Sequence, residues 1–188
     1  LLQSDFLWSD HDRIDRTAYQ SMERWQEAWQ PDALKRYDPL SVTSYFLESS
    51  IPLPQPLAHR LINLLLHLSA ALILLKVLES LKLRGAFAAS LLFALHPAVV
   101  PTLFWPGYRS ELVGLAFILL SLFFAIRNRS SRDFLLAMVF SLISSLLHPT
   151  ALALPLLAAL AIFYQNRSVH LHHYNRVLPL FCIALFAG

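Results

Sequence analysis

The chain has 188 residues, of which 56% are hydrophobic and 14% are charged, and its mean hydropathy is +0.52. Soluble domains carry about 25% charged residues on average, so this composition excludes an ordinary soluble protein. The formal net charge is +3. The basic residues stand in short clusters between apolar runs, a pattern typical of loops between membrane helices and not of nucleic-acid binding. The single cysteine, Cys182, excludes a disulfide framework.

The acidic residues are concentrated near the N-terminus. Of the twelve, only Glu79, Glu111 and Asp133 follow position 50. The chain is therefore expected to consist of a polar first segment, 1–56, and a membrane domain, 57–188. Because it begins without Met and stops inside an apolar run, we expect flanking segments to be missing from the sequence at both ends.

The polar segment predicts an extracytoplasmic loop that carries one amphipathic helix over about 18–30. Thr17 and Gln20 fit a capping box, and four apolar residues follow on one helical face. These four are Ala18, Met22, Trp25 and Trp29. Tryptophan on the apolar face favours a helix at the membrane interface; a soluble helix packed on its own domain is the alternative. Residues 31–56 contain five prolines and are expected to form an irregular loop.

Six apolar helices are expected in the membrane domain. They cover about 58–81, 86–96, 110–126, 134–147, 150–164 and 177–188. A membrane span needs about 20 apolar residues, so several of these helices are short. His96-Pro97 ends the second helix, and the residues up to Tyr108 are expected to be irregular. His148-Pro149 divides an uncharged run into two helices that meet at a turn, with one kinked helix as the alternative.

The basic loops predict the orientation. If residues 1–56 are extracytoplasmic, the loops 82–85, 127–133 and 165–176 are cytoplasmic, and each contains lysine or arginine, as the positive-inside rule requires. A single kinked helix over 134–164 would move two arginines outside, so the rule favours the hairpin. We therefore expect an all-α, polytopic, integral membrane protein.

Polar side chains of the first loop and the first membrane helix are the first candidates for chemistry. The carboxylates of Asp10 and Asp12 could act as a general base, or bind a divalent metal together with phosphate; otherwise they are simply solvated. Arg60, Asn63 and His67 share one helical face. Because polar groups at membrane depth are costly, these three should face the protein interior or a wet cavity. Asn63 and His67 could instead bond to neighbouring helices.

Two further segments are predicted to reach the same outer surface. Arg109 opens the third helix, near enough to the headgroups to bind phosphate. Glu111 lies in the first turn, where the helix dipole alone favours a carboxylate. His148 stands at the turn of the hairpin. The predicted convergence of Asp10, Arg60, Arg109 with Glu111, and His148 is the main functional signal in the sequence.

Several segments resemble the polytopic GT-C glycosyltransferases, and in particular the tetratricopeptide-containing O-mannosyltransferase-like proteins. The resemblance begins at Tyr37-Asp-Pro-Leu-Ser-Val and His59-Arg60-Leu-Ile-Asn63-Leu-Leu-Leu-His67. It continues at Phe87-Ala-Ala-Ser-Leu-Leu-Phe-Ala-Leu-His96-Pro97 and at Gly107-Tyr-Arg109-Ser-Glu111-Leu. Each piece is short, but their order and spacing together span about residues 6–164.

This resemblance implies a GT-C-like helical core with short, proline-broken helices and an acidic first outer loop that carries an interfacial helix. Such proteins transfer a sugar from a polyprenyl-phosphate donor on the outer or lumenal side. Asp10 would be the base or metal partner, and Arg109 with Glu111 would match the family's Arg/Glu pair. The expected partners are membrane lipids, a polyprenyl-phosphate-linked sugar and other membrane subunits, with no nucleic acid.

The chain departs from the family pattern at two places. The family has two adjacent acids where this chain has Ser9-Asp10, with Asp12 as the nearest second acid. It also has a Lys-Glu pair where this chain has His148-Pro149. These departures favour an alternative function, that of a catalytically degenerate relative acting as a structural or accessory subunit of a larger membrane complex. A transporter is less favoured, because no inverted repeat is visible.

Overall fold

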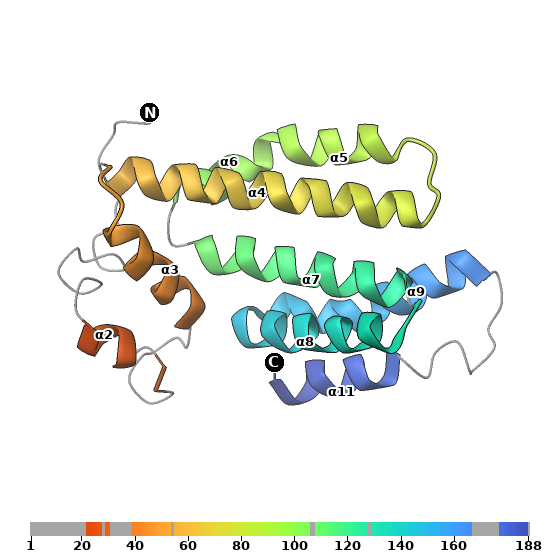
Figure 1. Cartoon of the computed structure of the whole chain (residues 1–188). Coiled ribbons are helices and arrows are strands. Elements are labelled where there is room, and N and C mark those ends of the chain that lie inside the picture. Colours follow the sequence, from red (N-terminus) through yellow and green to blue (C-terminus); the bar gives the residue numbers. More distant parts are fainter. Residues whose placement is uncertain are drawn as a thin grey trace. The chain divides into compact units, whose positions relative to one another are not determined.

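The computed structural model describes residues 22–27, 29–30, 39–53, 55–105, 108–127, 129–166 and 177–187. Within these ranges every regular element is a helix and there is no strand (Figure 1). The described part of the chain is therefore all-α, which confirms the fold class at this level. The chain divides into two compact units. Unit 1 comprises Leu1–His67 and Pro97–Val113, and unit 2 comprises Leu68–His96 and Gly114–Gly188.

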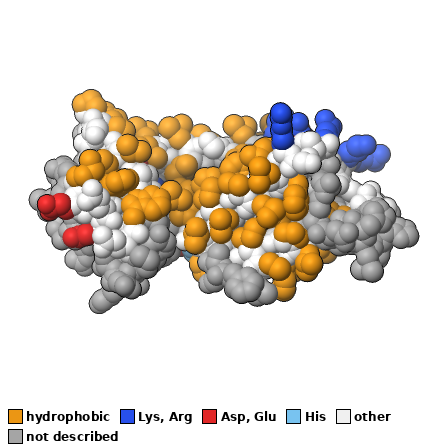
Figure 2. All heavy atoms as spheres, turned by 60° about the horizontal axis from the view of Figure 1, so that its bottom comes forward, with side chains coloured by type: hydrophobic (Ala, Val, Ile, Leu, Met, Phe, Trp, Pro, Cys, Tyr) orange, Lys and Arg blue, Asp and Glu red, His pale blue; other side chains and the backbone are white. Residues whose placement is uncertain are grey.

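Three described segments are long and apolar enough to cross a membrane: Leu57–Ser80, Arg109–Arg127 and Pro149–Asn166. The first lies in α4 (Gln55–Ser80), and the second is α7 (Arg109–Arg127). The third combines η3 (Pro149–Ala153) with α9 (Leu154–Asn166). Figure 2 shows hydrophobic side chains over much of the surface that it colours, as expected where lipid replaces water. The predicted membrane character is thus supported by helix length and composition.

Unit 1 contains a helix that the sequence did not predict. The segment 31–56 was expected to be irregular, but α3 occupies Pro39–Ser49. Pro39 is the first residue of this helix, where a missing N–H costs nothing, and no other proline follows until the helix has ended. The prolines therefore bound a helix instead of preventing one.

The amphipathic helix predicted over 18–30 is shorter than expected in its described part. It is observed as α2 (Met22–Glu27) and ends before Trp29, whose N–H donates to Gln26 O at 3.2 Å in a turn. Residues 18–21 lie outside the described residues. Trp25 joins α2 to α3: its Nε1 donates to Thr43 Oγ1 at 3.1 Å, and its ring centroid lies 6.3 Å from that of Phe46. Trp25 of this helix is thus packed on α3.

The segment after His96, also expected to be irregular, is helical from Pro97 to Phe104. It consists of η1 (Pro97–Val99) and α6 (Val100–Phe104), and it follows α5 (Ala86–Leu95) in the chain. Pro97 and Pro101 each stand in the first turn of a helix, where proline is tolerated. Proline at these positions therefore permits helical structure in a segment that was expected to be irregular.

Unit 2 is built around a hairpin. The segments predicted as helices over 134–147 and 150–164 are observed as α8 (Ser131–Leu147) and as η3 followed by α9. His148 separates them in extended conformation. The last helix, α11 (Val177–Ala187), packs against both α8 and α9. The break between α8 and η3 falls at His148, directly before Pro149, because the residue before a proline disfavours helical geometry.

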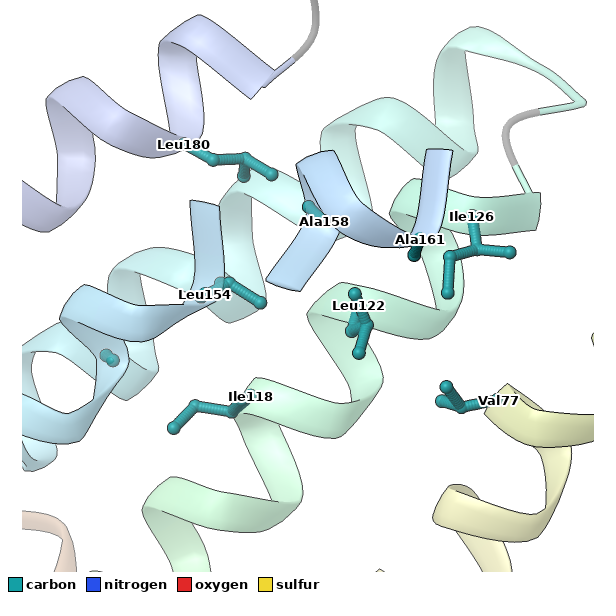
Figure 3. Close-up of a cluster of buried hydrophobic side chains, with 9 residues drawn as sticks. Val77, Ile118, Leu122, Ile126, Leu154, Ala158, Ala161 and Leu180 are labelled. Carbon is teal, nitrogen blue, oxygen red and sulfur yellow. The ribbon is translucent and has the colours of Figure 1, made fainter. Parts of the chain in front are cut away.

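The hydrophobic core of unit 2 draws on α4, α7, η3, α9 and α11 (Figure 3). Its buried members are Val77, Ile118, Leu122, Ile126, Ala151, Leu154, Ala158, Ala161 and Leu180. The small side chains come from the hairpin, where alanine allows neighbouring helices to approach closely. Packing of this kind holds membrane helices together when lipid offers no hydrophobic driving force between them.

Candidate functional site

A buried polar cluster in unit 1 is the most developed site in the described part of the chain. It is centred on Arg109 at the start of α7, whose side chain is fully buried. Glu48 from α3 and His59 and Asn63 from α4 surround it, and all three are at most 2% exposed. Charged and polar groups are this deeply buried only when they are paired with one another.

Each nitrogen of the Arg109 guanidinium has a protein partner. Nε donates to Asn63 Oδ1 at 2.8 Å, Nη1 donates to Ser44 Oγ at 3.1 Å, and Nη2 donates to the His59 carbonyl at 3.0 Å. Nη1 also forms an ion pair with Glu48. The Tyr45 ring lies against the guanidinium, with its centroid 4.8 Å from Cζ. Arg109 therefore joins α3, α4 and α7 through a single side chain.

Glu48 uses both of its carboxylate oxygens in the cluster. Oε1 pairs with Arg109, and Oε2 contacts His59 Nδ1. The His59 ring also meets Tyr45 edge-on, at 5.3 Å between centroids. Since Glu48 and Tyr45 lie one turn apart on α3, these contacts fix that helix on α4 and α7 through one face.

Asn63 connects the cluster to a third part of unit 1. While its Oδ1 accepts from Arg109, its Nδ2 donates to the Thr102 carbonyl at 3.2 Å, with the Leu103 and Trp105 carbonyls at 3.5 Å. These carbonyls lie at the C-terminal end of α6, where the helix supplies no N–H partners. Asn63 thus satisfies the end of α6 and orients Arg109 at the same time.

The predicted site residues fall into different parts of the structure. Arg60 is buried in unit 1, with its Cζ 5.9 Å from the centroid of the Phe104 ring of α6. Glu111 lies partly exposed in the first turn of α7. His148 belongs to unit 2, where its Nδ1 accepts from Thr150 N at 3.3 Å and caps η3. Its predicted convergence with Arg60 and Arg109 stays a prediction.

Asp10 and Asp12, the predicted catalytic carboxylates, lie outside the described residues. Among the residues that the structure does describe, no group of three or more His, Cys, Asp and Glu side chains could hold a metal ion. The predicted role of Arg109 as a phosphate ligand stays a prediction; its side chain is fully buried, and each of its three nitrogens already has a protein partner.

The sequence did not identify Glu48 or His59 as partners of Arg109. Glu48 was one acid among many in a segment expected to be a loop, and its place on α3 was hidden by the surrounding prolines. One signal was present: Ser44, Tyr45 and Glu48 recur at helical spacing between two prolines. Helical spacing alone does not tell which distant residue such a face meets.

The described part of the chain is thus all-helical, it contains helices suited to a membrane, and in unit 1 a buried polar cluster joins α3, α4 and α7. No protein-family model, curated protein or solved structure matches the chain.

Proposed function

We propose that the chain is a GT-C-type membrane protein that transfers a sugar from a polyprenyl-phosphate donor on the outer or lumenal side of the membrane. One observation carries the proposal. His59, Asn63 and Arg109 come from two separate segments that resemble the GT-C proteins, and these residues are in direct contact in unit 1. A resemblance limited to short apolar segments is better supported when the polar residues of those segments are bonded to one another.

The proposed orientation places residues 1–56 outside the cytoplasm and the three basic loops inside it. Supporting this, the last turns of all three candidate membrane spans line one pocket of unit 2, to which α4 contributes Ser80, α7 contributes Arg127 and α9 contributes Gln165. Chain segments that leave these three helix ends therefore start on the same side. The positive-inside rule assigns that side to the cytoplasm, because the segments contain lysine and arginine.

The proposed roles follow the resemblance. Asp10 acts as general base or as a metal partner in the first loop, with Asp12 beside it. Arg60, Glu111 and His148 contribute to binding of the donor, and the arginine provides the charge that a lipid phosphate requires. The Glu48–Arg109 pair is a positioning element: it fixes α3, a helix of the first loop, on α7, while the contact of Glu48 with His59 fixes it on α4.

The Asp10→Asn variant tests this function. Loss of a general base lowers the rate by about 10²–10⁴-fold, so sugar transfer by the purified protein is expected to fall by at least about 100-fold. The donors are polyprenyl-phosphate-linked mannose and glucose with a radiolabelled sugar, a membrane extract supplies the acceptor, and transfer of label out of the lipid phase is measured. Asp15→Asn, the same change in the same segment, is the matched control. Equal activity in the two variants would rule out the role of Asp10.

The accessory-subunit alternative is favoured by the protein partners that each nitrogen of Arg109 already has, together with the departures at Ser9 and at His148-Pro149. A subunit is expected to show no transfer with any polyprenyl-phosphate donor and to purify with a second membrane protein at constant stoichiometry. Mass measurement of the complex extracted from native membranes separates the two functions. Extraction of the protein as a single chain would contradict the accessory-subunit function.

A further inference from the structure

A polar pocket of about 500 Å³ lies in unit 2, at the ends of the helices that are suited to cross a membrane. Its polar lining comes from the last turns of α4 and α9, from the end of α7, and from Arg129, two residues beyond that end. These residues are Lys76, Glu79, Ser80, Arg127, Arg129 and Gln165. The ends of membrane spans lie at the level of the lipid headgroups, so the pocket opens where headgroup phosphates are found.

The charge of the pocket is positive. Lys76, Arg127 and Arg129 provide three cations, while Glu79 provides one carboxylate that pairs with Lys76 at 2.9 Å. Asp133 stands beside the pocket, with Oδ2 3.8 Å from Arg127 Nε. The cations exceed the carboxylates by one even when Asp133 is counted, three against two.

The positive side chains of unit 2 are also gathered and accessible. Every described lysine and arginine of this unit is exposed, and Figure 2 shows the Lys and Arg side chains together in one region of the surface. Lysine and arginine at the end of a membrane helix extend their charge toward the interface and keep their stems in the apolar layer. An anion at the interface therefore meets these cations without entering the hydrocarbon.

The pocket is held open by contacts between different helices. Gln165 Nε2 donates to the Ser80 carbonyl at 3.4 Å and so links the ends of α9 and α4. Asp133 accepts the backbone N–H of Arg129 at 2.8 Å, which fixes the turn between α7 and α8. Phe123 and Ile126 form the apolar part of the lining. A polar mouth with an apolar wall suits an amphipathic ligand.

From this geometry we propose that the pocket binds the phosphate of an anionic phospholipid headgroup. Its volume lies within the range of about 300–1,000 Å³ found for small-molecule sites. One arginine side chain can bind two phosphate oxygens at once. Basic pockets between membrane helices are suited to such headgroups. The proposal does not depend on the proposed sugar transfer, because every residue that carries it belongs to unit 2.

Removal of two cations tests the site. In the purified full chain, the double variant Arg127→Gln/Arg129→Gln is expected to weaken binding of phosphatidylglycerol by at least about tenfold, since each cation near an anionic headgroup contributes substantially. Binding is measured by native mass spectrometry in detergent during titration with the lipid. The control is Arg84→Gln/Arg132→Gln, which removes the same charge from exposed arginines outside the pocket lining and is expected to change affinity less than about twofold.

Three outcomes would overturn the proposal. If both double variants bind phosphatidylglycerol equally weakly, the lipid responds to the net charge of the protein and not to this pocket. An equal effect on phosphatidylcholine would mean that the anionic headgroup is not recognised. Binding of inorganic phosphate that depends on Arg127 and Arg129, without such dependence for phosphatidylglycerol, would assign the site to free phosphate. If the double variant unfolds, Arg129→Gln alone is used, because its exposed side chain carries no packing, and it is expected to weaken lipid binding by about threefold or more.

Discussion

Replacement of Arg109 by methionine is expected to lower the free energy of unfolding by about 3–5 kcal/mol. The change leaves the carboxylate of Glu48 at 2% exposure without its cation, and breaking a buried pair from one side costs about that much. It also removes the donors to Ser44, to Asn63 and to the His59 carbonyl. The measurement is the unfolding temperature in detergent, followed by tryptophan fluorescence. Arg84→Met, at an exposed position, is the matched control.

The double variant Glu48→Gln/Arg109→Met separates the ion pair from general packing. With both charges removed, no unpaired ion stays buried. The double variant is therefore expected to unfold at a higher temperature than Arg109→Met alone. A glutamine at this position can still bond to His59. Two results would contradict a role of Arg109 in holding the three helices together. In the first, Arg109→Met unfolds at the same temperature as Arg84→Met. In the second, the double variant unfolds at a lower temperature than Arg109→Met.

Replacement of Leu154 by alanine is expected to lower the free energy of unfolding by about 2–5 kcal/mol. Leu154 is fully buried and belongs to the core of unit 2, which also includes residues of α7 and α11 (Figure 3). The cost combines lost contacts with the cavity that the truncation leaves. The change in unfolding temperature, or in resistance of the purified protein to denaturing detergent, measures it.

The control for this prediction lies on the same helix. Leu156, two residues further along α9, is 64% exposed, and in a membrane it faces lipid. Leu156→Ala is therefore expected to change the free energy of unfolding by less than about 0.5 kcal/mol. Equal losses in the two variants would contradict the observed packing of α9, and a larger loss in Leu156→Ala would mean that its outer face is covered by protein.

The predicted contact of Arg109 with a lipid phosphate stays a prediction, and the structure shows its present partners. Sequence position favoured contact with a headgroup, since an arginine near the end of a span can reach the interface. In the structure its nitrogens are bonded to α3 and α4 instead. The first-loop helix α3 thereby depends on the membrane helices for its place, and any function of the first loop depends on this pair.

Local features of the sequence were sufficient for the helical class, for the apolar segments of membrane length and for the break at His148-Pro149. Each of these features depends on a short segment of sequence. A long apolar run predicts a helix of membrane length, and a proline disfavours helical backbone conformation at the residue before it. Helix α3 and the helical segment Pro97–Phe104 were predicted wrongly as irregular, because proline in a first turn permits a helix that proline within the helix would break.

Residue type alone shows that Arg60, Asn63 and Arg109 need polar surroundings, since burial of such groups without partners is costly. Their actual partners are known only from the way the helices pack. Asn63 lies between Arg109 and the end of α6, and Glu48 meets Arg109 from a helix far away in sequence. The need for a partner is a property of one side chain, whereas its identity depends on how whole helices pack, and no local pattern encodes that.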